Sequence, residues 1–282
     1  MSLTRTEVKN LLLKYEIHPK KSLGQNFVVE PNTIRQIIKL ADLDSADFVI
    51  EVGSGLGSLT LALLESCEHV TAVEVDDVLV NILKEVTGEQ TENKLRIIHE
   101  DVMKLNLKQV LEEKSNHWNL VANLPYNIAV PMICDFLEKA PLISKMTVMV
   151  QREVAERMVA KAGEKAYGVP SVKIEYFAEA KIIADIPPTV FIPKPRVESS
   201  IVQIVRHENP IISEDYEVLF SLIKSAFRHR RKMLRSSLKG ILSTDDFAAT
   251  EIDPTKRAEN LALKEWELLT KQIVARGHKQ HG

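Results

Sequence analysis

The sequence predicts a doubly wound α/β domain followed by a small α-helical domain. Short runs rich in β-branched and aromatic residues alternate with amphipathic segments long enough for crossover helices, which is typical of a parallel sheet with helices on both faces. A glycine-rich turn follows the first run, where domains of this class hold a ligand at the carboxyl ends of their strands. After residue 210, apolar residues recur at a spacing near 3.6, which predicts helices.

Seven β-rich runs are predicted to form the strands of one sheet. The first five alternate with amphipathic segments and cover Phe48–Val52, Val70–Val75, Leu95–Ile98, Trp118–Ala122 and Met146–Val150. The last two, Ala180–Ile186 and Ser199–Val205, are expected to close the sheet as a hairpin-like edge. Crossover helices are expected over Leu59–Glu65, Val78–Val86, Pro131–Lys139 and Glu153–Ala160.

The C-terminal part of the chain predicts three further helices, over Tyr216–Phe227, Lys232–Lys239 and Leu263–Val274. The charged, turn-prone stretch His207–Pro210 separates them from the predicted sheet. We therefore expect one domain over residues 1–209 and a second over residues 210–282.

The composition excludes several classes of protein. The chain has 282 residues, of which 45% are hydrophobic and 27% charged, as in a globular protein. No apolar run reaches the roughly 18 residues of a membrane span, and the first ten residues lack a signal-peptide core, so no membrane partner is expected. Cys67 and Cys134 lack CxxC spacing, and the histidines lack metal-ligand spacing. We expect no metal site, and a location in the reducing cytoplasm.

The net charge of −2 conceals two unlike parts. Residues 1–210 carry 24 basic and 29 acidic side chains, whereas residues 211–282 carry 13 basic and 10 acidic ones. The near-zero total is therefore an average, and it does not exclude a nucleic-acid partner for the C-terminal part.

Three alternating glycines lie in the segment Glu51–Gly57, directly after the first predicted strand. They allow a tight turn and a close approach of a ligand to the backbone. Glu74, at the end of the second strand, suits the two hydroxyls of a ribose, and Asp101, after the third, suits an adenine amino group. A dinucleotide fingerprint would have its third glycine at position 58, which is Ser58, so the spacing favours S-adenosylmethionine (SAM).

The segment Asn123–Asn127 follows the fourth predicted strand. The amino group of adenine is a poor nucleophile, so acceptors placed at its hydrogens assist methyl transfer as the nitrogen becomes tetrahedral. The Asn123 side-chain oxygen and the Leu124 carbonyl are candidates for this pair. Pro125 stiffens the turn, and Tyr126 offers a flat face to an extruded base.

On these segments the sequence resembles the ribosomal RNA adenine N6-dimethyltransferases that act on small-subunit RNA. The resemblance covers about residues 18–240 and is carried by Ser22–Phe27, Glu51–Gly57, Glu74, Asp101, Asn123–Tyr126 and Phe191–Val197. It implies a Rossmann-like SAM-dependent methyltransferase sheet. It also implies N6,N6-dimethylation of adenines in 16S-type rRNA during ribosome assembly, with SAM as methyl donor.

The resemblance also implies roles for particular residues. The N-terminal segment, about residues 1–30, would include a lid over the cofactor, with Asn26 and the Val28 backbone at the methionine end. Members of the family usually have Leu at position 28, and Val should not disturb a backbone contact. The cofactor shell would also include Gly53, Gly55, Glu74, Asp101 and Asn123. Phe191 would form the second aromatic wall of the base pocket, opposite Tyr126.

A basic run lies in the C-terminal part, from Lys224 to Lys239. It has seven Lys or Arg residues and no acidic one, which favours contact with phosphates over an ordinary solvated helix face. The residues expected to bind RNA are Arg228, Arg230, Arg231, Lys232 and Arg235. Arg5, Lys14, Lys20 and Lys21 form a weaker basic arm near the N-terminus.

Three alternatives remain open at this point. The nearest is a large-subunit rRNA adenine N6-methyltransferase of the macrolide-resistance type, although Leu23–Asn26 and Asn123–Pro125 fit the small-subunit class better. A DNA adenine methyltransferase would more often have Pro-Pro-Tyr and a sequence-reading domain. An RNA-binding assembly factor with a secondary catalytic role is the third. For the small-subunit class we expect a monomer.

Overall fold

The structure, a computed structural model, describes residues 2–20, 23–88, 93–112, 117–125, 127–208 and 215–279. Its contacts divide the chain into two compact units. The sheet unit consists of Met1–Ala155 and Glu179–Arg206, and the helical unit of Glu156–Ala178 and His207–Gly282.

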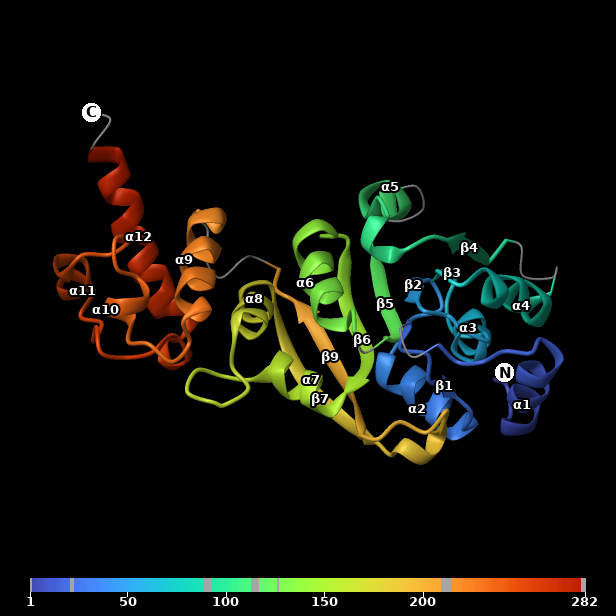
Figure 1. Cartoon of the computed structure of the whole chain (residues 1–282). Helices are drawn as coiled ribbons and strands as arrows, with labels where there is room; N and C mark the ends of the chain where they lie inside the picture. The colour runs from blue at the N-terminus through green and yellow to red at the C-terminus, as the bar shows by residue number, and fades with distance from the viewer. Residues whose placement is uncertain are drawn as a thin grey trace. The chain divides into compact units, whose positions relative to one another are not determined.

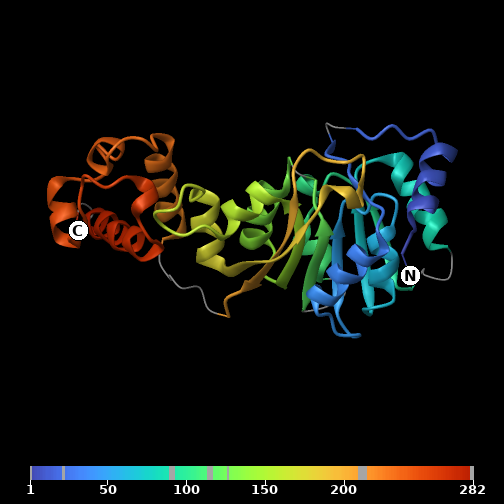
Figure 2. The ribbon, with the colours of Figure 1, turned by 90° about the horizontal axis from the view of Figure 1, so that it is seen from below.

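The sheet unit is built on a seven-stranded sheet, whose strands lie side by side in Figures 1 and 2. The strand order is β4-β3-β2-β5-β6-β9-β7. The strands are β2 (Phe48–Val52), β3 (His69–Glu74), β4 (Leu95–His99), β5 (Trp118–Asn123), β6 (Ile143–Gln151), β7 (Ala178–Ile186) and β9 (Ser199–Arg206). Each overlaps a run predicted from the sequence, to within three residues at either end.

The first five strands of this sheet are parallel, and β9 runs antiparallel to β6. Every residue of β3, four of five in β2 and five of six in β5 are buried. Because successive side chains of a strand point to opposite faces, burial of whole strands means that both faces of the sheet are covered. The predicted doubly wound α/β architecture is confirmed.

Helices of this unit pack on the sheet and on one another. They are α1 (Arg5–Lys14), α2 (Pro31–Ala41), α3 (Ser58–Leu64), α4 (Asp77–Thr87), α5 (Leu107–Glu112), α6 (Ala129–Lys139) and α7 (Arg152–Val159), whose last residues belong to the helical unit. One apolar core joins α2 and α3 to alternate residues of the strands, among them Val49, Val70 and Val121. A second core joins α1 and α4 through Val8, Leu79 and neighbouring side chains.

A separate two-stranded antiparallel sheet pairs β1 (Phe27–Val28) with β8 (Phe191–Ile192). Its register places Val28 opposite Phe191, and the Val29 amide donates to the Val190 carbonyl at 2.8 Å. This ribbon holds the N-terminal segment beside the sheet, although the two segments are far apart in the sequence. Neither Phe27–Val28 nor Phe191–Ile192 was predicted as a strand, because an apolar run of two residues is too short to indicate one.

The helical unit contains α8 (Val169–Phe177), α9 (Tyr216–Arg228), α10 (Leu234–Ser237), α11 (Thr244–Thr250) and α12 (Leu263–Lys279) (Figure 1). Predicted helices at Tyr216–Phe227 and Leu263–Val274 correspond to α9 and α12. The helix predicted over Lys232–Lys239 is wrong in extent, because the structure has only the four residues of α10 there. Arg230 to Lys232 form a turn, which the Lys232 amide closes by donating to the His229 carbonyl at 2.7 Å.

The helical unit contains a segment that the sequence assigns to the first domain. Glu156–Ala178 packs with the C-terminal helices, whereas the predicted boundary separates residues 1–209 from 210–282. Tyr167, fully buried, donates its hydroxyl to the Leu261 carbonyl at 2.9 Å. Such packing joins residues about a hundred positions apart, so no local pattern in the sequence marks it.

Candidate active site

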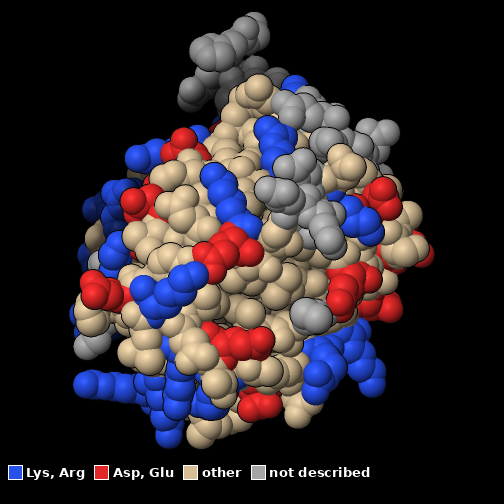
Figure 3. Space-filling view, turned by 90° about the vertical axis from the view of Figure 1, so that its right-hand side faces the viewer, with Lys and Arg blue, Asp and Glu red and all other residues tan. Residues whose placement is uncertain are grey.

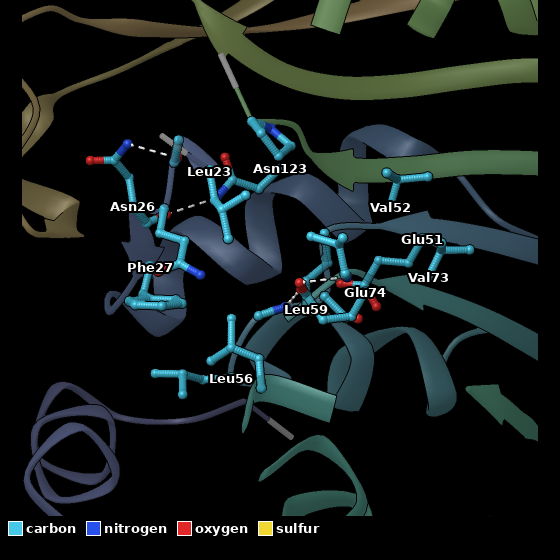
Figure 4. A pocket seen from close by; sticks show the side chains of 18 of the residues that line it. Leu23, Asn26, Phe27, Glu51, Val52, Leu56, Leu59, Val73, Glu74 and Asn123 are labelled. Atoms are coloured by element: carbon cyan, nitrogen blue, oxygen red, sulfur yellow. Dashed lines mark hydrogen bonds between the residues drawn. The ribbon is translucent and has the colours of Figure 1, made fainter. Parts of the chain in front are cut away.

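A pocket opens at the carboxyl ends of β2, β3 and β5, at the point where the strand order reverses (Figure 4). Open α/β sheets bind ligands at this point, because the loops on either side diverge there. Its walls come from the N-terminal segment Leu23–Val28, the turn Gly53–Ser54–Gly55, the ends of β3 and β4, and Asn123 with Pro125. The pocket therefore brings together most of the segments that the sequence singled out one by one, although no residue of Phe191–Val197 lines it.

The turn after β2 takes a backbone conformation that favours glycine. Gly53 has a φ of +74° and Gly55 a φ of +57°, both in the left-handed region. A Cβ on Gly55 would also lie 3.3 Å from the Phe27 ring. The turn thus needs glycine for its backbone, and it leaves the Gly55 amide pointing at the end of β3.

Glu74 is buried at the end of β3, with its carboxylate facing the glycine turn. It accepts hydrogen bonds from the Gly55 and Val75 amides, both at 2.9 Å, and from the Asp76 amide at 3.0 Å (Figure 4). Burial raises the pKa of Glu74, and the three amides act against that rise. The carboxylate is therefore held in one orientation before any ligand arrives.

Glu51 lines the floor of the same pocket and is 1% exposed. Burial raises its pKa to about 8, even though the Thr60 hydroxyl donates to it at 2.6 Å. The negative charge of Glu74 raises the pKa further. Glu51 is therefore largely protonated at neutral pH.

Two serine hydroxyls in the pocket lining have no hydrogen-bond partner among the residues that the structure describes. Ser54, in the glycine turn, and Ser58, at the start of α3, are both buried with unpaired Oγ atoms. Buried hydroxyls without partners are rare in proteins, because each gives up its hydrogen bonds with water. Neither residue was singled out as a ligand from the sequence, since serine in a glycine-rich turn is common.

Asp101 lies at the rim of the pocket, half-buried, after β4. Its Oδ1 accepts the Met103 amide at 3.0 Å and so caps a short 3₁₀ helix, Val102–Lys104. This bond engages one oxygen of the carboxyl group of a residue that lines the pocket.

Asn26 and Asn123 meet across the pocket mouth, and Val28 lies in the lining beside them (Figure 4). The Asn123 side-chain amide donates to the Asn26 carbonyl at 3.1 Å, and the Asn26 amide donates to the Gly24 carbonyl at 3.1 Å. Asn123 thus uses its Nδ2 to hold the N-terminal segment, and its Oδ1 remains an acceptor.

The residues after Asn123 continue the wall of the pocket. The Leu124 amide donates to the Met149 carbonyl at 3.0 Å, which extends the pairing of β5 with β6 by one residue. Pro125 lines the pocket, and its ring would be 3.4 Å from a Cβ on Gly53. Tyr126, the predicted stacking face, lies outside the described residues.

Phe191, the other predicted aromatic wall, is only 2% exposed. It belongs to the apolar core that also contains Val28 and Ile34, and it does not line the pocket. The ribbon of β1 and β8 brings it next to the N-terminal segment. Its predicted contact with a base would require the ring to become accessible.

The basic residues expected to bind RNA are all exposed, but they differ in their partners. Arg230 forms an ion pair with Glu259 at 2.6 Å and donates to the Lys165 carbonyl at 2.6 Å. Within the described residues, the side chains of Arg228, Arg231 and Lys232 form neither an ion pair nor a hydrogen bond. The positive charge of Arg235 lies close enough to Asp253 to lower the pKa of that carboxyl group. Arg230 is therefore the member of this set with a structural task.

A second segment adds a cation to this surface. Met233 forms an isolated β-bridge with Arg257, and the Leu234 amide donates to the Lys256 carbonyl at 2.8 Å. Arg257 is exposed. Because the bridge is long-range, the basic run alone gave no reason to single this residue out.

Most side chains of the basic arm near the N-terminus form ion pairs or hydrogen bonds within the sheet unit. Lys14 pairs with Glu85 at 2.6 Å, Lys20 pairs with Asp76 at 2.8 Å, and Arg5 donates to the Thr189 carbonyl at 2.8 Å. Figure 3, which faces the end of the molecule carrying α1, shows basic and acidic side chains interspersed. Lys21 lies outside the described residues.

Neither a metal cluster nor a membrane helix is found in the part of the chain that the structure describes. No group of three or more His, Cys, Asp or Glu side chains there is placed to hold a metal ion. No helix among the described residues is long and apolar enough to cross a membrane. Neither Cys67 nor Cys134 forms a disulfide bond.

Comparison with known proteins gives clear relatives. The profile of the family described as "Ribosomal RNA adenine dimethylase" matches residues 17–275. The chain is 39% identical, over 278 residues, to the "Ribosomal RNA small subunit methyltransferase A" of Alkaliphilus oremlandii. The alignment covers 95% of this chain and 96% of that protein. The chain is 41% identical to the protein of the same name in Mycobacterium avium, covering 98% and 89%.

Solved structures share the fold at lower sequence identity. A dimethyladenosine transferase from Plasmodium falciparum superposes with a TM-score of 0.75 at 23% identity, covering 88% of this chain and 97% of that one. The 23S rRNA methyltransferase ErmE superposes with a TM-score of 0.68 at 21% identity, covering 88% and 100%. At these identities the likeness concerns the fold alone.

Proposed function

The chain belongs to the ribosomal RNA adenine dimethylase family, and from that premise we propose that it dimethylates adenines of small-subunit ribosomal RNA at N6. The donor is SAM, and the reaction belongs to ribosome assembly. The observation that carries the proposal is the meeting of Glu74 and Asn123 in one pocket, the first suited to a ribose and the second to an adenine amino group. The two residues come from β3 and β5, on either side of β2.

The chemistry of the pocket fits SAM. Glu74 presents an oriented carboxylate for the ribose hydroxyls, and Asp101 an oxygen for the adenine amino group. The unpaired hydroxyls of Ser54 and Ser58 would gain partners from a polar ligand. Gly53 and Gly55 let it approach the backbone, while Asn26 and Val28 would meet its methionine end. When bound, SAM supplies a methyl group activated by a positively charged sulfur.

Asn123 would hold the target amino group. Its Nδ2 is directed to the Asn26 carbonyl, so its Oδ1 is free to accept a hydrogen from the adenine N6. The Leu124 carbonyl would accept the second hydrogen, and Pro125 keeps the turn rigid. Two fixed acceptors favour the tetrahedral, more positively charged nitrogen over the planar one, and the proton then leaves to solvent.

The base itself would lie between Tyr126 and Phe191, extruded from its stack. For Phe191 this requires the β1–β8 ribbon to move and expose the ring, because the ring is buried in the core that contains Val28 and Ile34. Movement of this ribbon would also shift Asn26 and Val28. Entry of the base would therefore be coupled to the position of the segment that binds the cofactor.

The exposed cations of the helical unit would hold the RNA backbone. We assign phosphate contacts to Arg228, Arg231, Lys232, Arg235 and Arg257, and a supporting task to Arg230, which pairs with Glu259. We also propose that the enzyme acts as a monomer. Its cysteines suit a reducing cytoplasm.

Labelled SAM offered to three substrates tests the proposal. The protein is incubated in parallel with unmethylated small ribosomal subunits, with large-subunit RNA and with duplex DNA, and the labelled nucleoside is identified. We expect dimethyladenosine in the small-subunit sample alone. Label in the large-subunit RNA would instead favour the macrolide-resistance type, and label in none of them would favour an assembly factor.

A further inference from the structure

Two charged groups outside the predicted cofactor shell meet beside the pocket. The Lys20 ammonium donates to Asp76 Oδ2 at 2.8 Å, and the Gln25 side-chain amide donates to the same oxygen at 3.2 Å. The Lys20 backbone amide donates in turn to the Gln25 side-chain oxygen at 2.8 Å. These three side chains close a ring of hydrogen bonds between the N-terminal segment and the start of α4.

Asp76 has a local task that needs no charge. It is the N-cap of α4, where its Oδ1 accepts the Val78 amide at 3.1 Å. Serine, threonine or asparagine would cap the helix equally well. A carboxylate that is only 6% exposed is costly unless it is paired, so the charge at this position calls for a partner.

That partner comes from the N-terminal segment. Burial tends to raise the pKa of Asp76, but hydrogen bonds from Lys20, Gln25 and the Val78 amide, together with the charge of Lys20, outweigh it, so the pKa is lowered. The same bond to Asp76 raises the pKa of Lys20. The pair is therefore ionised throughout the neutral range, and it ties residues 20 and 25 to the sheet unit.

The tied segment is a wall of the pocket. Leu23 to Val28 all line it, and the Gln25 amide is anchored to the Lys20 carbonyl. On the opposite side, the Asp76 backbone amide donates to Glu74 Oε1, the carboxylate assigned to the ribose. Asp76 thus contacts both walls, one through its side chain and one through its backbone.

We infer that Lys20, Gln25 and Asp76 are positioning residues that hold the Leu23–Val28 wall in place for the cofactor, so that they set SAM affinity without contacting the reacting atoms. This inference rests on the proposed function, because it takes SAM as the ligand of the pocket. It differs from a phosphate contact for Lys20, which would be seen in RNA affinity.

Binding of SAM to the full-length protein, measured by calorimetry in the absence of RNA, tests the inference. Lys20→Met and Gln25→Leu should each raise the SAM Kd by about three- to tenfold, as expected for loss of a charge-assisted bond at a partly exposed site. Lys20→Arg, which keeps the charge, should restore most of the affinity. Amide exchange at Gln25 and Asn26 should accelerate in Lys20→Met.

Lys14→Met is the matched control. Lys14 also pairs with a carboxylate of α4, Glu85. Within the described part of the chain, neither Lys14 nor Glu85 lines the pocket. Its SAM Kd should stay within twofold of the unmodified protein. Equal SAM affinity in Lys20→Met, Gln25→Leu and this control would overturn the inference and leave the proposed function intact.

Two further outcomes separate the possibilities. An unchanged SAM Kd with weaker RNA binding in Lys20→Met would make Lys20 a phosphate contact and overturn the positioning task. Failure of the unmodified protein to bind SAM at all would contradict the proposed function itself.

Discussion

The side-chain nitrogen and oxygen of Asn123 have different roles in the proposed mechanism. Its Nδ2 is bonded to the Asn26 carbonyl, so the orientation of the amide is fixed by the N-terminal segment and not by the substrate. An acceptor that is already oriented needs no reorganisation when charge develops on the target nitrogen. Asparagine is suited to this position because it has a donor and an acceptor on one rigid group.

Asn123→Ala should lower turnover by about 100- to 1,000-fold, as loss of one preoriented hydrogen-bond group does in other enzymes. Affinity for RNA should change by less than twofold, because the proposed phosphate contacts belong to the helical unit. Single-turnover rates and filter binding measure the two quantities. An unchanged single-turnover rate would remove the proposed role of Asn123.

Glu51 gives the unfolding free energy a dependence on pH. Its pKa is about 8 in the folded chain and near 4.5 when unfolded, so the folded state holds a proton that the unfolded state releases. The resulting stabilisation is fully present below about pH 4.5 and is lost as the pH rises towards 8. The slope is at most about 1.4 kcal/mol per pH unit.

Glu51→Gln keeps the acceptor for Thr60 and removes the ionisation. Urea unfolding between pH 5 and pH 8 should show falling stability for the unmodified protein and a flatter profile for the variant. Parallel profiles would mean that Glu51 is ionised in the folded protein.

At the level of elements, the basic run is the end of α9, a turn and the short α10, not one long helix. The turn directs Arg230 back to Glu259 and leaves its neighbours exposed. A loop that pairs with Met233 adds Arg257. One run of similar residues therefore contains members with different physical tasks.

Arg231→Ala with Lys232→Ala should weaken RNA binding and reduce the salt slope of the binding constant by about 0.7–0.9 for each phosphate that is no longer neutralised. Arg230→Ala should instead lower stability by about 1 kcal/mol, since an exposed ion pair and one hydrogen bond are removed. Binding titrations over a range of salt, together with urea unfolding, distinguish the two effects.

Lys264→Ala is the control for these variants, because Lys264 is exposed at the start of α12 and lies outside the run. It should leave the salt slope unchanged. If the double variant has the same salt slope of the RNA-binding constant as Lys264→Ala, the turn is ruled out as an RNA-binding segment.

At the level of the whole molecule, the chain enters the helical unit twice. Glu156–Ala178 joins it first, the chain then returns to the sheet through Glu179–Arg206, and the remaining residues complete it. Tyr167 and Val172, from the first passage, are fully buried with Trp266 from the last helix. The helical unit therefore depends on residues that precede the final strands of the sheet.

Tyr167→Ala should destabilise the helical unit by about 3–5 kcal/mol, because it removes a fully buried aromatic ring. Tyr167→Phe, which loses only the hydrogen bond to the Leu261 carbonyl, should cost about 1 kcal/mol. The SAM Kd should not change in either variant. Calorimetric unfolding measures the stabilities, and a changed SAM Kd would contradict the independence of the pocket.

The sequence alone determined the seven strands of the main sheet, most of the crossover helices and several of the residues that line the pocket, because these depend on local periodicity and on motifs a few residues long. The run Phe48–Val52 and the glycine turn after it needed no tertiary information. Tertiary structure decided which distant residues meet: Lys20 with Asp76, Arg230 with Glu259, Val28 with Phe191 and Tyr167 with Leu261. Each of these contacts joins segments between 29 and 163 positions apart, where burial, charge pairing and strand pairing act through space and leave no local pattern in the chain.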